Sequence, residues 1–211
     1  MSKQIRLRVV SLRAARGHLT FGHLMWSCAI GSGGVQSFKR EGDGATPAGR
    51  HKLIRLYYRH ERIIRPHTPL PLKVIRPDDG WADDPQYRPY NALVRLPFSG
   101  SHEKLARDDR LYDVVGVLDY NIRPAIAHRG SAIFFHLTRD ETAPPTAGCI
   151  AVEPRSMAQI LRLIGRHGVF VVPPVTERHS RRTTSLNRRR PCPLATRHTR
   201  PRQGPRRSTG R

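Results

Sequence analysis

Cysteine and acidic residues are scarce in this chain of 211 residues, and long apolar runs are missing. Its three cysteines are Cys28, Cys149 and Cys192, and they form no C-x-x-C pair. An odd, sparse set of this kind is not a disulfide framework, and without C-x-x-C a structural zinc site is not expected. No stretch approaches the ~20 apolar residues of a membrane helix. We therefore expect no metal, no cofactor and no transmembrane segment, and the oligomeric state stays open.

Acidic residues are few relative to basic ones, and the imbalance is uneven along the chain. There are 38 Lys and Arg against 16 Asp and Glu, a net charge of +22. Residues 176–211 hold twelve Arg and one acid, so this short segment carries half of that charge. It has too few apolar residues to offset its ordering entropy, and we expect it to be disordered, with a folded domain over 5–172. The charge favours anionic partners, but no recognition motif predicts a specific nucleic acid.

The basic N-terminus with the apolar stretch 24–30 is only weakly similar to an export signal. His18, Gly22 and His23 interrupt the apolar character, and Val9 and Val10 sit among arginines. The pattern favours strand over signal peptide, so an export route is not visible in the sequence.

The remaining pattern predicts a mainly β domain. We expect β-structure over residues 5–12, 19–30, 51–58, 112–120, 132–137, 148–152 and 169–172. Residues 66–84 are expected to be mostly loop, and Ser101 to cap a short helix through Arg107. One longer helix is predicted over 154–165, because Pro154 suits a first turn and Met157, Ile160, Leu161 and Ile164 share one face.

Cys149 is the best candidate for chemistry. Gly148 lets the backbone turn sharply, which leaves the N–H groups of Gly148 and Cys149 to bind a developing oxyanion. His136 ends a predicted strand, and the loop 138–147 returns the chain to Cys149, so imidazole and thiol can meet. A nearby imidazole would make this thiol ionise more readily than a free cysteine. From the spacing alone, a buried structural cysteine is the alternative.

Several stretches in the right order resemble the L,D-transpeptidase catalytic domain family, the YkuD-like fold of ErfK/YbiS type. They are Phe135-His136, Thr146-Ala147-Gly148-Cys149-Ile150 and Gly42-Asp43-Gly44-Ala45-Thr46-Pro47-Ala48-Gly49, with Gly130 to His136, Leu111-Tyr112-Asp113 and Tyr120-Asn121. The resemblance implies a β-sandwich or barrel with one packed helix, and a place in the cell envelope or periplasm. It also implies peptidoglycan stem peptides as the partner.

The implied reaction is an L,D-transpeptidation through a Cys149 thioester, with His136 as general base and acid. A carbonyl near Leu137 would orient His136, and Asp113 and Asp119 are weaker candidates. Water in place of an amine would make the protein an L,D-carboxypeptidase, and a non-catalytic peptidoglycan-binding domain is the other alternative.

This chain departs from the family pattern at three positions. Ala147 replaces the usual second His, Ala151 replaces an Arg or Asn, and Leu137 replaces a Gly. These changes bear on substrate choice and rate more than on the reaction class.

The other candidates have structural explanations. Cys28 and Tyr112 are expected in the core, although Tyr112 could donate its phenol to a substrate. Trp81, Asp83 and Asp84 are expected in a packed loop, and the alternative is that they line a groove.

Overall fold

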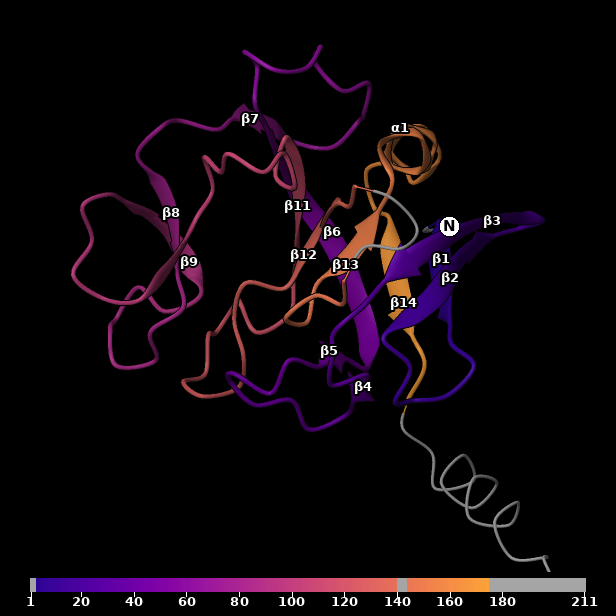
Figure 1. Ribbon diagram of the computed structural model, residues 1–211, viewed down its shortest axis with the longest axis horizontal. Coiled ribbons are helices and arrows are strands. Elements are labelled where there is room, and N and C mark those ends of the chain that lie inside the picture. The colour runs from indigo at the N-terminus through magenta and orange to yellow at the C-terminus, as the bar shows by residue number, and fades with distance from the viewer. Residues whose placement is uncertain (1–2, 140–143, 175–211) are drawn as a thin grey trace, which may run out of the picture.

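A closed β-barrel dominates the protein (Figure 1). The structure is a computed structural model that describes residues 3–139 and 144–174. Eight strands close into a mixed barrel in the order β11-β12-β13-β3-β2-β1-β14-β6, and β6 pairs with β11. The mainly β class with one short helix is confirmed. The segment 176–211, for which the sequence predicts disorder, lies outside the described residues.

The barrel strands have these bounds: β1 (Gln4–Arg8), β2 (Arg16–Phe21), β3 (Leu24–Ala29), β6 (Gly49–Tyr58), β11 (Val114–Leu118), β12 (Phe134–Leu137), β13 (Ile150–Val152) and β14 (Val169–Val172). The region 19–30 is a hairpin of two strands, β2 and β3, joined by Gly22 at φ +60. A short strand, β7 (Leu72–Val74), extends the edge at β6, and β4 (Val35–Gln36) pairs with β5 (Thr46–Pro47).

A small antiparallel sheet covers part of the outside of the barrel. It consists of β8 (Asp79–Ala82), β9 (Ala92–Arg95) and β10 (His102–Lys104). Residues 66–84 are mostly loop, as expected, with β7 and β8 as the exceptions. The other expectation is wrong: no helix runs from Ser101 to Arg107. Residues 102–104 instead pair with β8, and Asp84 accepts the Ser101 N–H at 3.3 Å. Tertiary strand pairing satisfies this backbone better than one isolated helical turn would.

The helix α1 (Pro154–Leu163) ends two residues earlier than expected. Its predicted apolar face is buried: Met157, Ile160 and Leu161 belong to the main core with the inward-facing barrel residues. Gln159 accepts the indole N–H of Trp26 at 2.6 Å, which joins the helix to β3. None of the helical structure in the described part of the chain is long and apolar enough to span a membrane.

Strand β12 is buried on both faces, which explains its continuous apolar sequence. Successive strand residues point to opposite faces. Phe135 and Leu137 therefore join the barrel core, while Phe134 packs in a second core under the small sheet, together with Trp81 and Cys149. The site described below lies on this outer face.

Candidate active site

Strand register brings Cys149 and His136 to one face. In the parallel pair β12–β13, Phe135 lies opposite Ile150 and His136 opposite Ala151. Because side chains alternate, His136 and Ala151 share the outer face, and Cys149, two residues before Ala151, lies on it too. Both candidate residues line one cavity of about 960 Å³. Cys149 is 7 % exposed and His136 6 % exposed, so each is buried but reached from this cavity.

The thiol of Cys149 is held by backbone groups. Its Sγ donates to the carbonyl of Ala132 at 3.2 Å and accepts the N–H of Phe134 at 3.3 Å. Burial raises the pKa of the thiol to about 12, against a smaller lowering by the Phe134 N–H. The sequence-based expectation of easier ionisation is wrong for this structure, because desolvation of the thiolate exceeds every favourable contact. At neutral pH the thiol is protonated and needs a base.

His136 is fixed in one tautomer. Its Nδ1–H donates to the carbonyl of Leu137 at 2.7 Å, which leaves Nε2 with a free lone pair. Burial lowers the pKa of His136 to about 4, and the Leu137 carbonyl opposes that shift. The ring packs edge-on to Tyr112, with centroids 5.2 Å apart. The histidine is thus a neutral imidazole, which is the protonation state of a general base.

The predicted orienting carbonyl near Leu137 is that of Leu137 itself, and neither aspartate takes this role. Asp113 pairs with Arg62 at 3.2 Å, and Asp119 accepts the Lys52 N–H at 2.7 Å. Among the described residues, no hydrogen bond joins the thiol to the imidazole. A proton therefore passes directly between them only after a side-chain movement.

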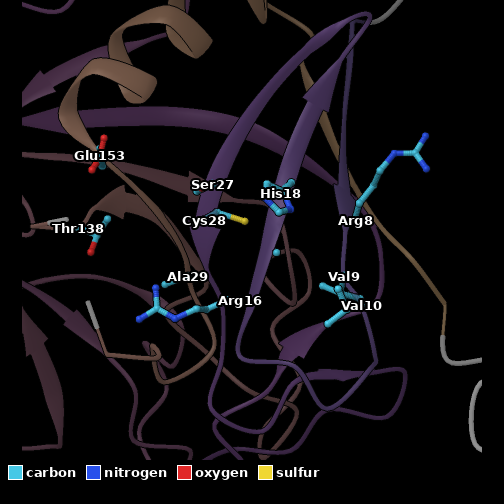
Figure 2. A pocket seen from close by; sticks show the side chains of 11 residues that line it. Arg8, Val9, Val10, Arg16, His18, Ser27, Cys28, Ala29, Thr138 and Glu153 are labelled. Carbon is cyan, nitrogen blue, oxygen red and sulfur yellow. The ribbon is translucent and has the colours of Figure 1, made fainter. Parts of the chain in front are cut away.

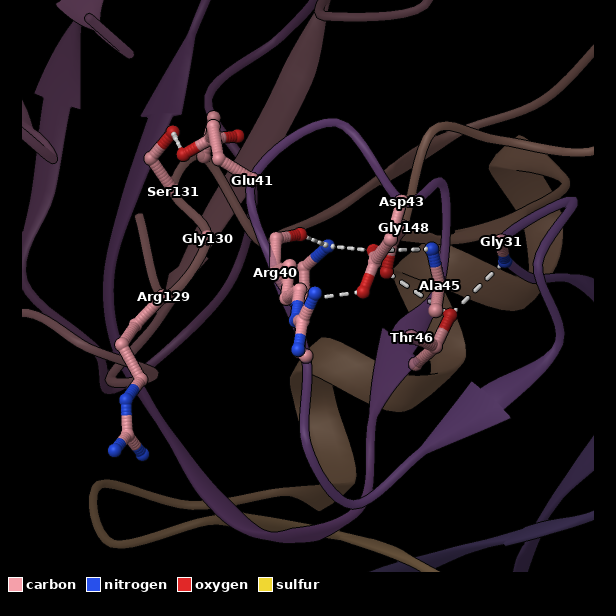
Figure 3. A network of polar contacts seen from close by, with 12 residues as sticks. Gly31, Arg40, Glu41, Asp43, Ala45, Thr46, Arg129, Gly130, Ser131 and Gly148 are labelled. Carbon is pink, nitrogen blue, oxygen red and sulfur yellow. Dashed lines mark hydrogen bonds and ion pairs between the residues drawn. The ribbon is translucent and has the colours of Figure 1, made fainter. Parts of the chain in front are cut away.

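The turn at Gly148 strongly favours glycine. Its φ is +136, and a Cβ there would lie 2.7 Å from the carbonyl oxygen of Ala45. Thr46 donates to the Gly148 carbonyl at 2.9 Å and accepts the Gly31 N–H, as Figure 3 shows. The predicted turn at Thr46 therefore braces the residue before the thiol.

One of the two predicted oxyanion donors is already engaged. The Gly148 N–H donates to Thr146 Oγ1 at 3.1 Å, and the same hydroxyl donates to the Cys149 carbonyl at 2.7 Å. Within the described residues, the Cys149 N–H has no acceptor. It is thus the available donor for an oxyanion, and the assignment of this role stays a prediction.

Two alanines, Ala147 and Ala151, line the cavity and add no polar side chain to it. Ala147 is exposed at the cavity wall, and Ala151 is buried opposite His136. Leu137 packs inward in the barrel core and contributes its carbonyl instead.

Asn91 is a structural residue that the sequence analysis missed. Its side-chain oxygen accepts the Trp81 indole N–H at 2.9 Å and the Ala132 N–H at 3.0 Å. Its amide nitrogen donates to the Tyr120 carbonyl at 3.1 Å. Asn91 thereby joins the small sheet to the residue whose carbonyl binds the thiol. No local motif signals this, since the partners are far apart in sequence.

For Trp81 and Asp83 the sequence left two alternatives, a packed loop or the lining of a groove, and the two residues differ. Trp81 is buried, with its ring against Phe134, as expected for a packed residue. Asp83 lines the cavity, as does the buried Tyr112.

A second cavity, of about 440 Å³, surrounds Cys28 (Figure 2). Cys28 is a buried core residue, as predicted, and burial raises its pKa to about 12. The exposed His18 and Arg8 also line this cavity.

The chain matches the family model of YkuD, the L,D-transpeptidase catalytic domain, over residues 9–176. Among solved structures it is similar to that of Bdellovibrio bacteriovorus Bd1075, with a TM-score of 0.39 and 14 % identity over 88 % of this chain. The chain spans about half, 54 %, of that protein's length. No curated protein matches it. Because the matched range covers well over half of the sequence, the chain belongs to the YkuD L,D-transpeptidase catalytic domain family.

Proposed function

We propose that this protein carries out cysteine-dependent acyl transfer on peptidoglycan stem peptides, as an L,D-transpeptidase of the cell envelope. The observation that carries the proposal is the placement of Cys149 and His136 on one face of paired parallel strands, inside one cavity. Family membership supports an L,D-transpeptidase-like activity on peptidoglycan.

In the first step, Cys149 Sγ attacks the carbonyl carbon of the bond between an L-centre and a D-amino acid. The thiol proton passes to Nε2 of His136, whose tautomer the Leu137 carbonyl maintains. The Cys149 N–H stabilises the oxyanion. The C–N bond then breaks, His136 returns the proton to the leaving amine, and a thioester remains.

In the second step, an amine from a neighbouring stem attacks the thioester carbon. It gives its proton to His136, the C–S bond breaks, and the thiolate takes the proton back. The product is a peptide crosslink. Water as the nucleophile would instead release a shortened stem, the carboxypeptidase outcome.

Before substrate binds, Cys149 and His136 are both neutral. This restricts how the first step can begin. With the thiol pKa raised to about 12 and the imidazole pKa lowered to about 4, proton transfer in the empty cavity is uphill. Ionisation must therefore accompany substrate binding or attack, when the thiolate is consumed as it forms.

The test is incubation of the full chain with defined muropeptides, with products and adducts read by mass spectrometry. We expect a thioester on Cys149 and loss of the terminal D-residue, and neither in Cys149→Ser. Cys28→Ser is the matched control and should retain both. Crosslinked and hydrolysed products differ in mass, which separates transpeptidase from carboxypeptidase. Binding without turnover, or acylation of Cys28 or Cys192, would overturn the proposal.

A further inference from the structure

The cavity at Cys149 contains carboxylates without cationic partners, in a chain with far more basic than acidic residues. Glu41, Asp83 and Glu103 all line it. Glu103 is neutralised by Arg107 at 2.8 Å. Among the described residues, Glu41 and Asp83 take part in no ion pair. Arg107 and Arg139 also line the cavity, but neither forms an ion pair with Glu41 or Asp83 among the described residues.

Asp83 carries the strongest signal. It follows β8 directly, and its N–H donates to the Ser101 carbonyl at 3.2 Å. Its Oδ1 is shielded from solvent and has no hydrogen-bond partner among the described residues. A carboxylate oxygen that loses water and gains no donor is costly, and native proteins rarely leave one so. A cation arriving from the cavity at the half-buried carboxylate would offset that cost.

Glu41 adds a second charge that is held in place without being neutralised. Its Oε2 accepts hydrogen bonds from the Tyr90 hydroxyl and from Ser131 Oγ, the latter at 2.8 Å (Figure 3). Ser131 directly precedes Ala132, whose carbonyl binds the Cys149 thiol. The charge of Glu41 is therefore anchored one residue away from the thiol's own partner.

The two carboxylates are joined by one short structural link. Tyr90, which binds Glu41, is followed by Asn91, and the Asn91 N–H donates to the Ala82 carbonyl at 2.8 Å. Ala82 ends β8, and Asp83 is the next residue. Glu41 and Asp83 are thus connected through a hydrogen-bonded segment of the small sheet.

We propose that Asp83, assisted by Glu41, is a specificity-determining residue that binds an ammonium group of the substrate in the cavity of Cys149. This inference rests on the proposed function, in which both stems belong to amine-bearing peptides. The ammonium belongs either to a side chain of the donor stem or to the acceptor. An acceptor bound as ammonium gives its extra proton to the Asp83 carboxylate and then attacks as the neutral amine. A carboxylate with an unsatisfied oxygen selects the charged amine over the same amine when it is acylated.

The test uses the full chain with Cys149→Ser, so that binding is measured without turnover. Calorimetry compares a stem tetrapeptide that has a free side-chain amine with the same peptide acetylated at that amine. We expect about tenfold tighter binding of the free amine, the scale of one charge-assisted hydrogen bond. Adding Asp83→Asn should remove most of that preference, and Glu41→Gln part of it. Asp84→Asn, at a neighbouring carboxylate outside the cavity lining, should preserve it.

The source of the ammonium is separated by a second measurement on the wild-type cysteine. If Asp83→Asn weakens only the dependence of crosslinking rate on acceptor concentration, the ammonium belongs to the acceptor. Equal binding of both peptides, together with an acceptor dependence that Asp83→Asn does not change, would overturn the inference. Amine-selective binding to a protein that forms no thioester would instead refute the proposed function and leave the subsite intact.

Discussion

Cys28 and Cys149 are two thiols of this protein that are buried to almost the same extent. Cys28 is 5 % exposed and Cys149 7 % exposed, each lines a cavity, and burial raises the pKa of each to about 12. The difference lies in their neighbours. Cys149 shares a face of the sheet with the buried His136. The histidine that lines the cavity of Cys28 is the exposed His18, which pairs with Ser27 across β2 and β3. Burial and pKa do not separate the two thiols, so the proposed role of Cys149 as nucleophile rests on the position of His136.

The largest expected difference between the two thiols is in their reaction with an acyl donor. Cys149→Ser should lower thioester formation by at least about a thousandfold, because an alcohol is a far weaker nucleophile beside the same base. Cys28→Ala should leave the rate within about twofold and cost about 1 kcal/mol of stability, since it removes one buried sulfur. Mass spectrometry of acylated protein and thermal melts measure the two effects. A similar loss of rate in both variants would contradict the distinction.

The next largest difference is expected between the two histidines that line these cavities. His136→Ala should lower the rate of acylation by about a hundredfold or more, the usual scale for losing a positioned proton carrier. His18→Ala, at the other cavity, should change it by less than about twofold. Quenched time courses with a labelled donor peptide give the acylation rates of both variants. If His136→Ala keeps the wild-type rate, another group accepts the thiol proton.

The glycine before the thiol tests how strictly the backbone is shaped there. Gly148→Ala should cost about 2 to 3 kcal/mol of unfolding free energy, because alanine is strained at this φ and its Cβ meets the Ala45 carbonyl. Gly22→Ala also places alanine at positive φ, but nothing lies within 4 Å, so we expect about 1 kcal/mol. Denaturant titrations followed by circular dichroism compare the two. Equal costs would mean that the clash at Gly148 is relieved by local movement.

The smallest effect concerns pH. The folded-state pKa of His136 is about 4, below its ordinary 6.5, so the unfolded chain binds a proton that the folded chain does not. That contribution to stability is present above pH 6.5 and is lost as the pH falls towards 4, by about 2 kcal/mol between pH 7 and 5. His136→Gln should flatten this part of the profile, and His18→Gln should not. Identical acid-side slopes in both variants would show that His136 is not a buried neutral base.

How far the sequence predicts the structure depends on whether a feature is local. The helix from Pro154 and the strand from Val169 have a periodicity and end signals within a few residues, and both are confirmed. For residues 101–107 the sequence predicts a short helix, but the structure has the strand β10, because its strand character comes from pairing with residues about twenty positions earlier. The same holds for Asn91, whose four side-chain hydrogen bonds reach three distant segments.

The sequence by itself determined the family, the mainly β class, and the order of a histidine followed by glycine and cysteine, because these are written in local motifs. Only the tertiary structure decided that His136 and Cys149 share a face, since this depends on the parallel register of β12 and β13. It also reversed the expected direction of the thiol pKa. That shift is set by desolvation under a second core that includes Trp81 and Tyr112, and no local pattern reports how completely such distant side chains exclude water.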